Sequence, residues 1–509
     1  MGGDRRGTRV RRRERGAGMK IGMITEGTYP IHPGGVSQWC DLLLRRLPDI
    51  AFEVVALSGS GREHATYDPP DNVTRVHRVG LWGATPSSRR ASPLERYRVV
   101  IAYEELVDAV LAEDHFAAAR FEAAVRTLRE LARQVGLTHV LRSQACVDVF
   151  LAVWRRRMDD GAGSGPARLT LADALVATDI IEHYLRPLQL PLTDVDVVHA
   201  TANGPATLIG LLHKWERGTP VIVSEHGVYL RERIMWLRGT GDSRALRTAL
   251  IRFFTRLTEL GYRAADLILP VSDFNGGWAM RNGAPRQNVR TVYNGIDPED
   301  FPLARAEPEQ PTLVFAGRVD PLKDLETLLR AFAIVRGRVP GARLRLFGGV
   351  PEGNTGYAER CTTLMADLEI ADVATFEGPV SPVHLAYGSG HVNVLSSVSE
   401  GLPLSVLEAA MSGRPTVATD VGGMSEAVGP SGLIVPARDP EALADACAQL
   451  LLDGPLRRRL ADRGRRRALE MFTVHRMVDN FRRIYQDVAP ETGGPDTLVV
   501  EVVARAGQG

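Results

Sequence analysis

The chain has few cysteines, and it has no long apolar run. The four cysteines among 509 residues, Cys40, Cys146, Cys361 and Cys447, show no CxxC spacing. This excludes a disulfide framework and a cysteine-based zinc site, and it favours the reduced thiols of a cytoplasmic protein. No apolar stretch approaches the roughly 20 residues that a membrane-spanning helix needs. We therefore expect a cytoplasmic protein, at most peripheral to the inner face of a membrane.

Lysine is also scarce, and neither sign of charge dominates. The 62 basic and 61 acidic residues leave a formal net charge of +1, which gives no bulk attraction to nucleic acid. Only Lys20, Lys214 and Lys323 are lysines. The twelve histidines form no HxH or HExxH spacing, and no Asp-x-Asp pair ends a strand-like run, so we predict no metal site. No pattern indicates an oligomeric state.

The two ends of the chain differ from its middle. Residues 1–18 contain seven arginines and no apolar segment, which predicts a disordered tail or a misassigned start. An arm that binds nucleic acid or lipid is the weaker interpretation. Residues 489–509, rich in glycine, threonine and alanine, predict a flexible tail.

Between these ends, strand-like and helix-like patterns alternate in two blocks. The first block, 19–305, starts with a strand at 21–26, a glycine-rich loop and a helix at 36–47. Long arginine-rich amphipathic segments then predict a helical insertion at about 85–187. Strand-like runs resume at 195–199, 221–224, 267–271 and 289–293.

The second block, 306–471, follows a proline-containing linker. Its strand-like runs are 312–316, 344–347, 373–376, 392–395, 416–419 and 433–435. Strands that alternate with helices of about 10–15 residues favour βαβ units and a parallel sheet. We therefore predict an α/β fold of two Rossmann-like domains that face a cleft. A last helix within 472–488 should return to the first domain.

Two carboxylates stand eight residues apart after a strand of the second block. Residues 399–410 read SEGLPLSVLEAA, and the Gly-Leu-Pro stretch predicts a loop that becomes helix near Leu404. Glu400 would lie at the mouth of the cleft and Glu408 inside the helix. The helix amino terminus at Leu404 and Ser405 would present free N–H groups that suit a diphosphate. Two solvated glutamates are the alternative, and the flanking pattern disfavours it.

A cationic pair follows the first strand of the second block. Arg318 and Lys323 lie in the run GRVDPLKD, where they can clamp a diphosphate and offset negative charge that develops on it. A lysine in a chain that otherwise uses arginine favours a specific role, because lysine is a compact point charge. A solvated face is the alternative.

These patterns together resemble a known family. The resemblance to family 4 retaining glycosyltransferases of the GT-B architecture is carried by 399–410, Arg318, Lys323, 294–297 and the Gly34-Gly35 loop. The runs 25–30, 34–39 and 224–233 look more narrowly like the PelF-like subgroup of bacterial exopolysaccharide synthesis. The family resemblance covers about 19–487.

The resemblance implies a role for each donor-side residue. Arg318 and Lys323 would hold the diphosphate of a nucleotide sugar. The backbone at Gly34 and Gly35 would approach that diphosphate closely, which a side chain would obstruct. Glu408 would bind the ribose hydroxyls.

It also implies two catalytic candidates, Glu400 and His226. Glu400 and Gly401 would meet the donor sugar near the reacting carbon, and His226 would face the sugar from the acceptor side. His226 is followed by Gly227, where many members have aspartate, so its partner and tautomer stay open. A hydrogen-bonded histidine at a strand end is the alternative.

The implied activity is metal-independent transfer of a hexosyl group to a hydroxyl on a glycan or lipid-linked acceptor. The subgroup resemblance suggests UDP-glucose as donor, and the family implies front-face attack assisted by the leaving phosphate. The alternatives are another GT-B enzyme, such as a phosphorylase or epimerase, and a non-catalytic nucleotide-sugar-binding or scaffold subunit. The three lysines offer no good anchor for the pyridoxal phosphate of a phosphorylase.

One basic amphipathic helix is predicted at 244–262. Its apolar residues, among them Leu246, Leu250 and Phe253, form one stripe. The stripe could lie on an anionic membrane near a lipid-linked acceptor, but packing inside the protein is the commoner outcome.

Overall fold

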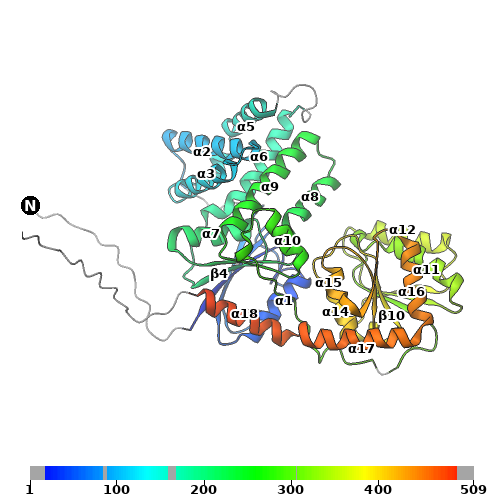
Figure 1. Cartoon of the computed structure of the whole chain (residues 1–509). Helices are drawn as coiled ribbons and strands as arrows, with labels where there is room; N and C mark the ends of the chain where they lie inside the picture. Colours follow the sequence, from blue (N-terminus) through cyan, green and yellow to red (C-terminus); the bar gives the residue numbers. More distant parts are fainter. Residues whose placement is uncertain (1–17, 84–88, 159–167, 305, 490–509) are drawn as a thin grey trace, which may run out of the picture.

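The chain folds into two α/β domains (Figure 1). The computed structural model describes residues 18–83, 89–158, 168–304 and 306–489. Each domain is built on a parallel sheet of six strands with helices around it, which confirms the predicted fold of two Rossmann-like domains. The two predicted tails lie outside the described residues, apart from Gly18 and Ala489.

The first sheet has its strand order reversed at its centre. In spatial order its strands are β3 (Val73–Gly80), β2 (Ala51–Ser58), β1 (Lys20–Glu26), β4 (Val197–Ala200), β5 (Val221–Glu225) and β6 (Leu267–Pro270). The chain order changes direction between β1 and β4. Ligands of such sheets bind beyond the carboxyl ends of the strands at this switch point.

The second sheet repeats the same order. Its strands are β12 (Gly432–Val435), β11 (Thr416–Thr419), β10 (Val392–Leu395), β7 (Thr312–Ala316), β8 (Arg343–Phe347) and β9 (Ala374–Gly378). Every residue of the central strands β7 and β10 is buried, as expected where helices cover both faces of a parallel sheet. The switch point lies between β7 and β10.

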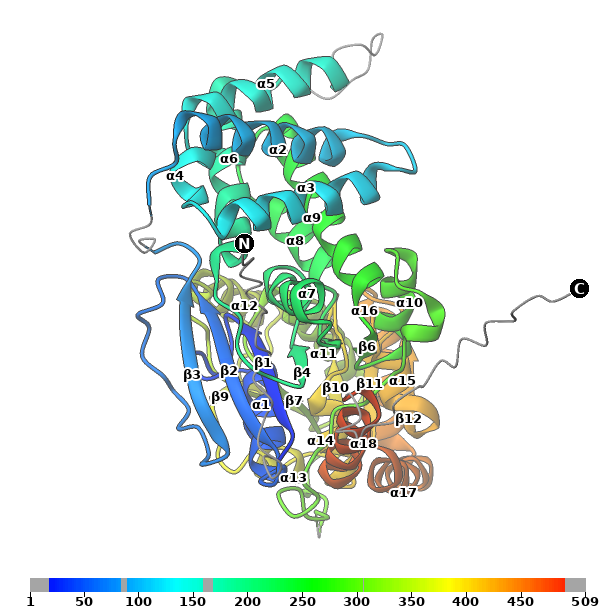
Figure 2. The same ribbon diagram turned by 90° about the vertical axis from the view of Figure 1, so that its left-hand side faces the viewer.

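A layer of helices stands above the first sheet (Figure 2). The predicted insertion contains α2 (Pro93–Leu111), α3 (Ala117–Ala132), α4 (Leu137–Leu141), α5 (Gln144–Met158) and α6 (Leu171–Leu185). These helices form one hydrophobic core, and the helix α9 (Arg244–Ala264) buries its apolar stripe, including Leu246, Leu250 and Phe253, in that core. The membrane interpretation of the segment 244–262 is therefore wrong, because the stripe is covered by the protein itself.

The remaining helices surround the two sheets. They are α1 (Gly35–Arg46), α7 (Pro205–Arg217), α8 (Tyr229–Gly239), α10 (Asp273–Arg281), α11 (Leu325–Arg338), α12 (Thr355–Asp367), α13 (His384–Gly388), α14 (Leu404–Met411), α15 (Met424–Val428), α16 (Pro440–Leu452), α17 (Gly454–Met471) and α18 (Val474–Val488). Within the described ranges, no helix combines the length and the apolar character that a bilayer crossing requires.

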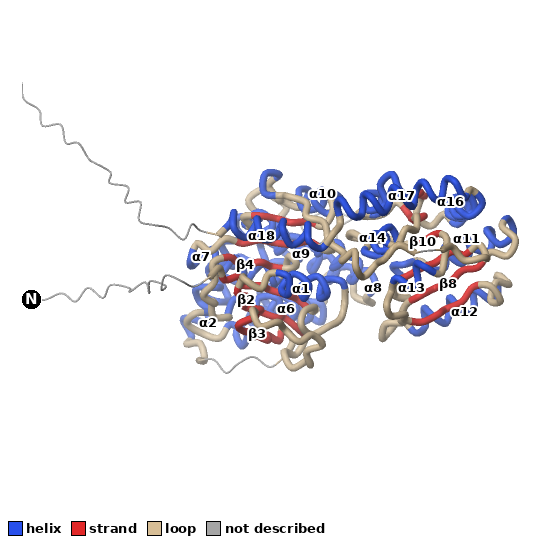
Figure 3. The backbone as a smooth tube through the Cα atoms, turned by 90° about the horizontal axis from the view of Figure 1, so that it is seen from below, coloured by secondary structure: helices blue, strands red, loops and turns tan. Residues whose placement is uncertain are grey.

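The chain crosses between the domains twice, and the two crossings are hydrogen-bonded to each other. The Ile296 amide donates to the Phe472 carbonyl at 2.8 Å, and the Val474 amide donates to the Ile296 carbonyl at 2.9 Å. A Cβ on Gly295 would lie 2.6 Å from the Thr473 carbonyl oxygen, so only glycine fits there. After the second crossing, α18 packs beside α1 on the first domain (Figures 1 and 3).

One predicted strand is wrong. The segment 289–293 forms no strand, and only Val289 makes an isolated bridge, to Ile268. The segment runs beside the edge strand β6, which has only four residues. It makes two backbone hydrogen bonds to β6, from Arg290 and Val292, and then turns toward the second domain.

Candidate functional site

Lys323 and Glu400 meet at the switch point of the second sheet. Lys323 lies in the loop after β7, and Glu400 lies in the loop after β10, 77 positions later. The Lys323 Nζ donates to the Glu400 Oε1 at 2.5 Å, and the Ser397 hydroxyl donates to the same oxygen at 2.6 Å. The side chains of Lys323 and Glu400 are 19% and 12% exposed, so the ion pair is largely shielded from water.

Arg318 occupies the same loop as Lys323 but has a different environment. It follows β7 by two residues, and its side chain is exposed. Lys323 ends a short 3-10 turn, Pro321–Lys323, in which the Leu322 amide donates to the Asp320 side chain and the Lys323 amide donates to the Asp320 carbonyl. The loop therefore places one cation, Lys323, in a fixed position, while Arg318 extends into solvent at the carboxyl edge of the sheet.

Glu408 is fixed by a residue that the sequence did not predict. Its Oε2 accepts a hydrogen bond from the Tyr387 hydroxyl at 2.6 Å. Burial raises the pKa of Glu408, and the bond from Tyr387 opposes that rise. The helix that carries Glu408, α14, begins at Leu404 and has no side-chain cap, so its first N–H groups at Leu404 and Ser405 lie at an uncapped amino terminus.

A cavity of about 600 Å³ between the domains is lined by some of the predicted site residues. It is lined by Gly35 from the first domain and by Leu404 and Glu408 from the second. A Cβ on Gly34 or Gly35 would meet no protein atom within 4 Å. The packing of the protein therefore does not require glycine at these positions. The space beside the two glycines is open to a ligand. Lys323 and Glu400 are not among the residues that line this cavity, although Glu400 is only four positions before Leu404.

His226 lies where the two domains touch. It follows the last residue of β5, and its ring packs against Trp39 with centroids 4.4 Å apart. Burial lowers the pKa of His226 to about 4, so the ring is neutral near pH 7. Its Nε2 is closed off from solvent and has no hydrogen-bond partner among the described residues. A second interdomain contact lies nearby, where the Arg231 guanidinium donates to the Ser399 hydroxyl.

A cluster of carboxyl groups near His226 was not predicted as a site. Glu26 ends β1, Glu225 ends β5 and Glu232 lies in the first turn of α8, and all three line one small cavity. Burial raises the pKa of Glu26 to about 7 and that of Glu225 to about 8. The only available signal was that these residues fall in the runs 25–30 and 224–233, which carry the subgroup resemblance.

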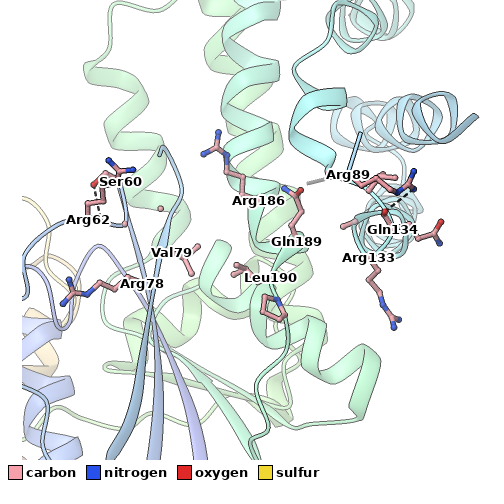
Figure 4. Close-up of a pocket in the computed structure, with 16 residues that line it drawn as sticks. Ser60, Arg62, Arg78, Val79, Arg89, Arg133, Gln134, Arg186, Gln189 and Leu190 are labelled. Atoms are coloured by element: carbon pink, nitrogen blue, oxygen red, sulfur yellow. Dashed lines mark hydrogen bonds between the residues drawn. The ribbon is translucent and has the colours of Figure 1, made fainter. Parts of the chain in front are cut away.

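Another cavity, of about 660 Å³, lies between the edge of the first sheet and the helical layer (Figure 4). Five arginines line it, but their charges do not converge. Arg78 and Arg133 point outward on opposite sides in Figure 4, and the Arg186 guanidinium is held by both carboxylate oxygens of Glu182. These observations give the cavity no clear anion site.

Within the described ranges, three potential metal ligands gather on α6: Asp179, Glu182 and His183. The carboxylate of Glu182 accepts hydrogen bonds from Arg186 at 3.0–3.1 Å. The Nδ1 of His183 donates to the Asp179 carbonyl at 2.6 Å. Both groups are thus engaged by the protein.

Comparisons with known proteins identify the class. Residues 310–453 match the family model described as glycosyl transferases group 1, and residues 19–287 match a domain of unknown function (DUF3492). The chain belongs to the group 1 glycosyltransferase family, and its two parallel sheets are those of the GT-B fold.

Curated relatives cover part of the chain. A D-inositol 3-phosphate glycosyltransferase from Saccharomonospora viridis is 34% identical over 298 residues, which are 55% of this chain and 67% of the relative. A similar protein from Catenulispora acidiphila is 38% identical over 219 residues, 40% of this chain and 51% of the relative. A GDP-mannose-dependent phosphatidylinositol monomannoside mannosyltransferase from Mycobacterium tuberculosis is 32% identical over 290 residues, 51% of this chain and 68% of the relative. The matched part of the chain thus spans 51–68% of the length of these proteins.

Two solved structures share the fold over almost the whole described chain. Sucrose-phosphate synthase from Thermosynechococcus elongatus has a TM-score of 0.59 at 18% identity, covering 92% of this chain and 99% of that one. HepE from Anabaena, in complex with UDP and glucose, has a TM-score of 0.56 at 14% identity, covering 91% and 99%.

Proposed function

We propose that this chain is a retaining family 4 glycosyltransferase of bacterial exopolysaccharide or glycoconjugate synthesis. It would move a hexosyl group from a nucleoside diphosphate sugar, with UDP-glucose as our first choice, to a hydroxyl of a glycan or lipid-linked acceptor. The observation that carries the proposal is the contact between Lys323 and Glu400 in the crevice between β7 and β10. The runs 25–30 and 224–233 support the PelF-like subgroup.

The geometry suggests how these residues would act. Lys323 and Arg318 would offset the charge on the diphosphate as the bond between the anomeric carbon and the phosphate oxygen breaks. Glu400 would accept a hydrogen bond from a donor-sugar hydroxyl in place of the bond from Lys323. Lys323 would then be free to bind the phosphate. The acceptor oxygen would form the new bond on the same face, and its proton would pass to the leaving phosphate oxygen. With this cationic pair, the reaction would need no divalent ion and no cofactor.

The ribose and diphosphate would lie along the interdomain cavity. Glu408 would bind the ribose hydroxyls, and the free N–H groups at Leu404 and Ser405 would face the diphosphate. The open space at Gly35 leaves room for the phosphates on the opposite wall. In this proposal Gly34 and Gly35 stay without side chains because of the ligand and not because of the fold.

The test is nucleotide release by the purified chain, from UDP-glucose and from GDP-mannose, with a chelator present. Lys323→Ala and Glu400→Ala should each abolish most of the release, because both groups touch the donor. Lys214→Ala is a matched control, since the Lys214 Nζ is bonded to Asp266 on the first domain at 2.7 Å. Release that is the same in both site variants as in the wild type would favour a non-catalytic scaffold.

A further inference from the structure

A small cavity lies at the switch point of the first sheet. It is lined by the ends of β1 and β5, by residues that follow β4, and by the start of α8. Its volume is about 140 Å³. Liquid water would fill that space with roughly five molecules at ~30 Å³ each, which is on the scale of one small ring with its hydroxyls.

Five polar atoms of the residues that line this cavity are buried and have no hydrogen-bond partner among the described residues. They are the Glu26 Oε2, Thr28 Oγ1, His226 Nε2, Tyr229 Oη and Arg233 Nε. Roughly nine in ten buried polar groups in proteins are hydrogen-bonded, so five such atoms around one cavity indicate a ligand. The set mixes acceptors with donors. Hydroxyl groups both donate and accept, so a ring with several hydroxyls matches it.

The charges around the cavity disfavour an anion. Three carboxyl groups line it, Glu26, Glu225 and Glu232, against one guanidinium, Arg233. Burial raises the pKa of all three carboxyl groups, because a negative charge is poorly solvated there, and the same lack of solvation disfavours a bound anion. Sites for phosphate use clusters of arginine or free helix termini. Here the first amide of α8, that of Tyr229, already donates to the Glu225 carboxyl group.

The cavity lies next to the reaction centre of the proposed function. His226, one of its lining residues, touches the loop that carries Glu400: a Cβ on Gly401 would lie 2.1 Å from the His226 carbonyl oxygen. We propose that this cavity is the acceptor subsite, that it takes a neutral hydroxyl-bearing ring, and that Glu26 accepts a hydrogen bond from one of its hydroxyls. This inference rests on the proposed transferase function. The relatives named for D-inositol 3-phosphate act, by that name, on a phosphorylated ring, so we infer a different acceptor for this chain.

The experiment uses the full chain and needs no knowledge of the natural acceptor. Saturation-transfer NMR on the chain saturated with UDP measures binding of D-glucose, N-acetylglucosamine, myo-inositol and glucose 6-phosphate. In a separate assay without added UDP, release of UDP from UDP-glucose is followed with each probe. At least one neutral ring should bind and accelerate release. Glucose 6-phosphate should bind at least about tenfold more weakly than glucose.

Two variants of the cavity wall test the role of Glu26. Glu26→Gln should weaken the neutral ring about tenfold and leave the donor KM within about twofold. Thr28→Ala should act in the same direction, and it keeps the charge of the cavity unchanged. Glu470→Gln, at an exposed position of α17, is the matched control.

Three results would overturn the inference while UDP still binds. These are a phosphorylated ring that binds as well as its neutral parent, a UDP complex that binds no neutral ring, and cavity variants that bind the ring as the control does. Failure of the wild-type chain to bind UDP at all would instead contradict the proposed function.

Discussion

The backbone of Gly401 lies directly against that of His226, so closely that a Cβ on Gly401 would be 2.1 Å from the His226 carbonyl oxygen. The two residues belong to different domains and lie in the loops after β10 and β5. The two domains can thus approach this closely at the candidate site because residue 401 has no side chain.

Gly401→Ala should therefore force the domains apart at this point. A displacement of about 1 Å at a reaction centre can cost on the order of a hundredfold in rate, so kcat/KM for the donor should fall by that order. The melting temperature should change little, because separation of the domains relieves the clash. Gly337→Ala, on an exposed position of α11 with open space around it, is the control. Full activity of Gly401→Ala would show that the domains work further apart.

Tyr387 should matter for nucleotide binding through Glu408. Tyr387→Phe removes the hydroxyl that donates to Glu408 at 2.6 Å and leaves the carboxyl group without that partner. The loss of one such bond costs about 1–1.5 kcal/mol, so we expect the donor KM to rise roughly five- to tenfold with kcat nearly unchanged. Steady-state kinetics measures both. Tyr97→Phe is the control, because Tyr97 is 64% exposed. A fall in kcat at constant KM would contradict a role in binding the donor.

Glu225 should make the stability of the first domain depend on pH. Burial raises its pKa from an ordinary value near 4.5 to about 8. Between these values the folded chain keeps a proton that the unfolded chain has released, so the free energy of unfolding falls as pH rises. The fall is at most about 1.4 kcal/mol per pH unit for one group. Above about pH 8 this contribution is constant.

Glu225→Gln should remove that slope. The melting temperature of the variant should fall less than that of the wild type between about pH 5 and pH 8.5. Part of the slope should remain, because Glu26 has a raised pKa as well. Thermal melts across this range, with Glu470→Gln as control, measure the effect. Parallel curves for wild type and Glu225→Gln would show that Glu225 titrates normally.

The helix α18 should stabilise the first domain although it follows the second in sequence. Phe481 on α18 is 2% exposed and packs against Trp39, with ring centroids 5.3 Å apart. Phe481→Ala should cost about 3–5 kcal/mol, and calorimetry should show the loss in the first-domain transition. Gln486→Ala, exposed on the same helix, should leave that transition in place. An unchanged first-domain transition in Phe481→Ala would contradict the packing.

Much of the second domain could be predicted from the sequence because its elements have sharp ends. The strands β7, β10 and β11 have the predicted bounds. Pro311 and Pro415 directly precede two of these strands. The strand β3 was missed, because it is an edge strand whose polar residues, such as Arg75 and Arg78, obscure the apolar pattern.

The sequence could not predict the cavity at Glu26. Its walls come from the ends of β1 and β5, from residues that follow β4 and from α8, and the helical insertion separates β1 from β4 in the chain. Periodicity gives the strands but not their order in space, so nothing in the pattern brings Glu26 near Glu225. The same limit applies to Tyr387, which reaches Glu408 from the neighbouring helix α13. By contrast, Lys323 and Glu400 follow strands with strong patterns, and both could be named before the fold was known.

The most direct measurement is calorimetric titration of UDP into the wild-type chain, Lys323→Ala and the double variant Lys323→Ala/Glu400→Gln. If Lys323 holds the diphosphate, Lys323→Ala should bind UDP at least about tenfold more weakly, because a charge-assisted contact to phosphate is lost. The loss should persist when Glu400→Gln also removes the carboxylate charge, and Lys214→Ala should bind as the wild type does. Wild-type affinity in Lys323→Ala, or its recovery in the double variant, would contradict a donor site at this crevice.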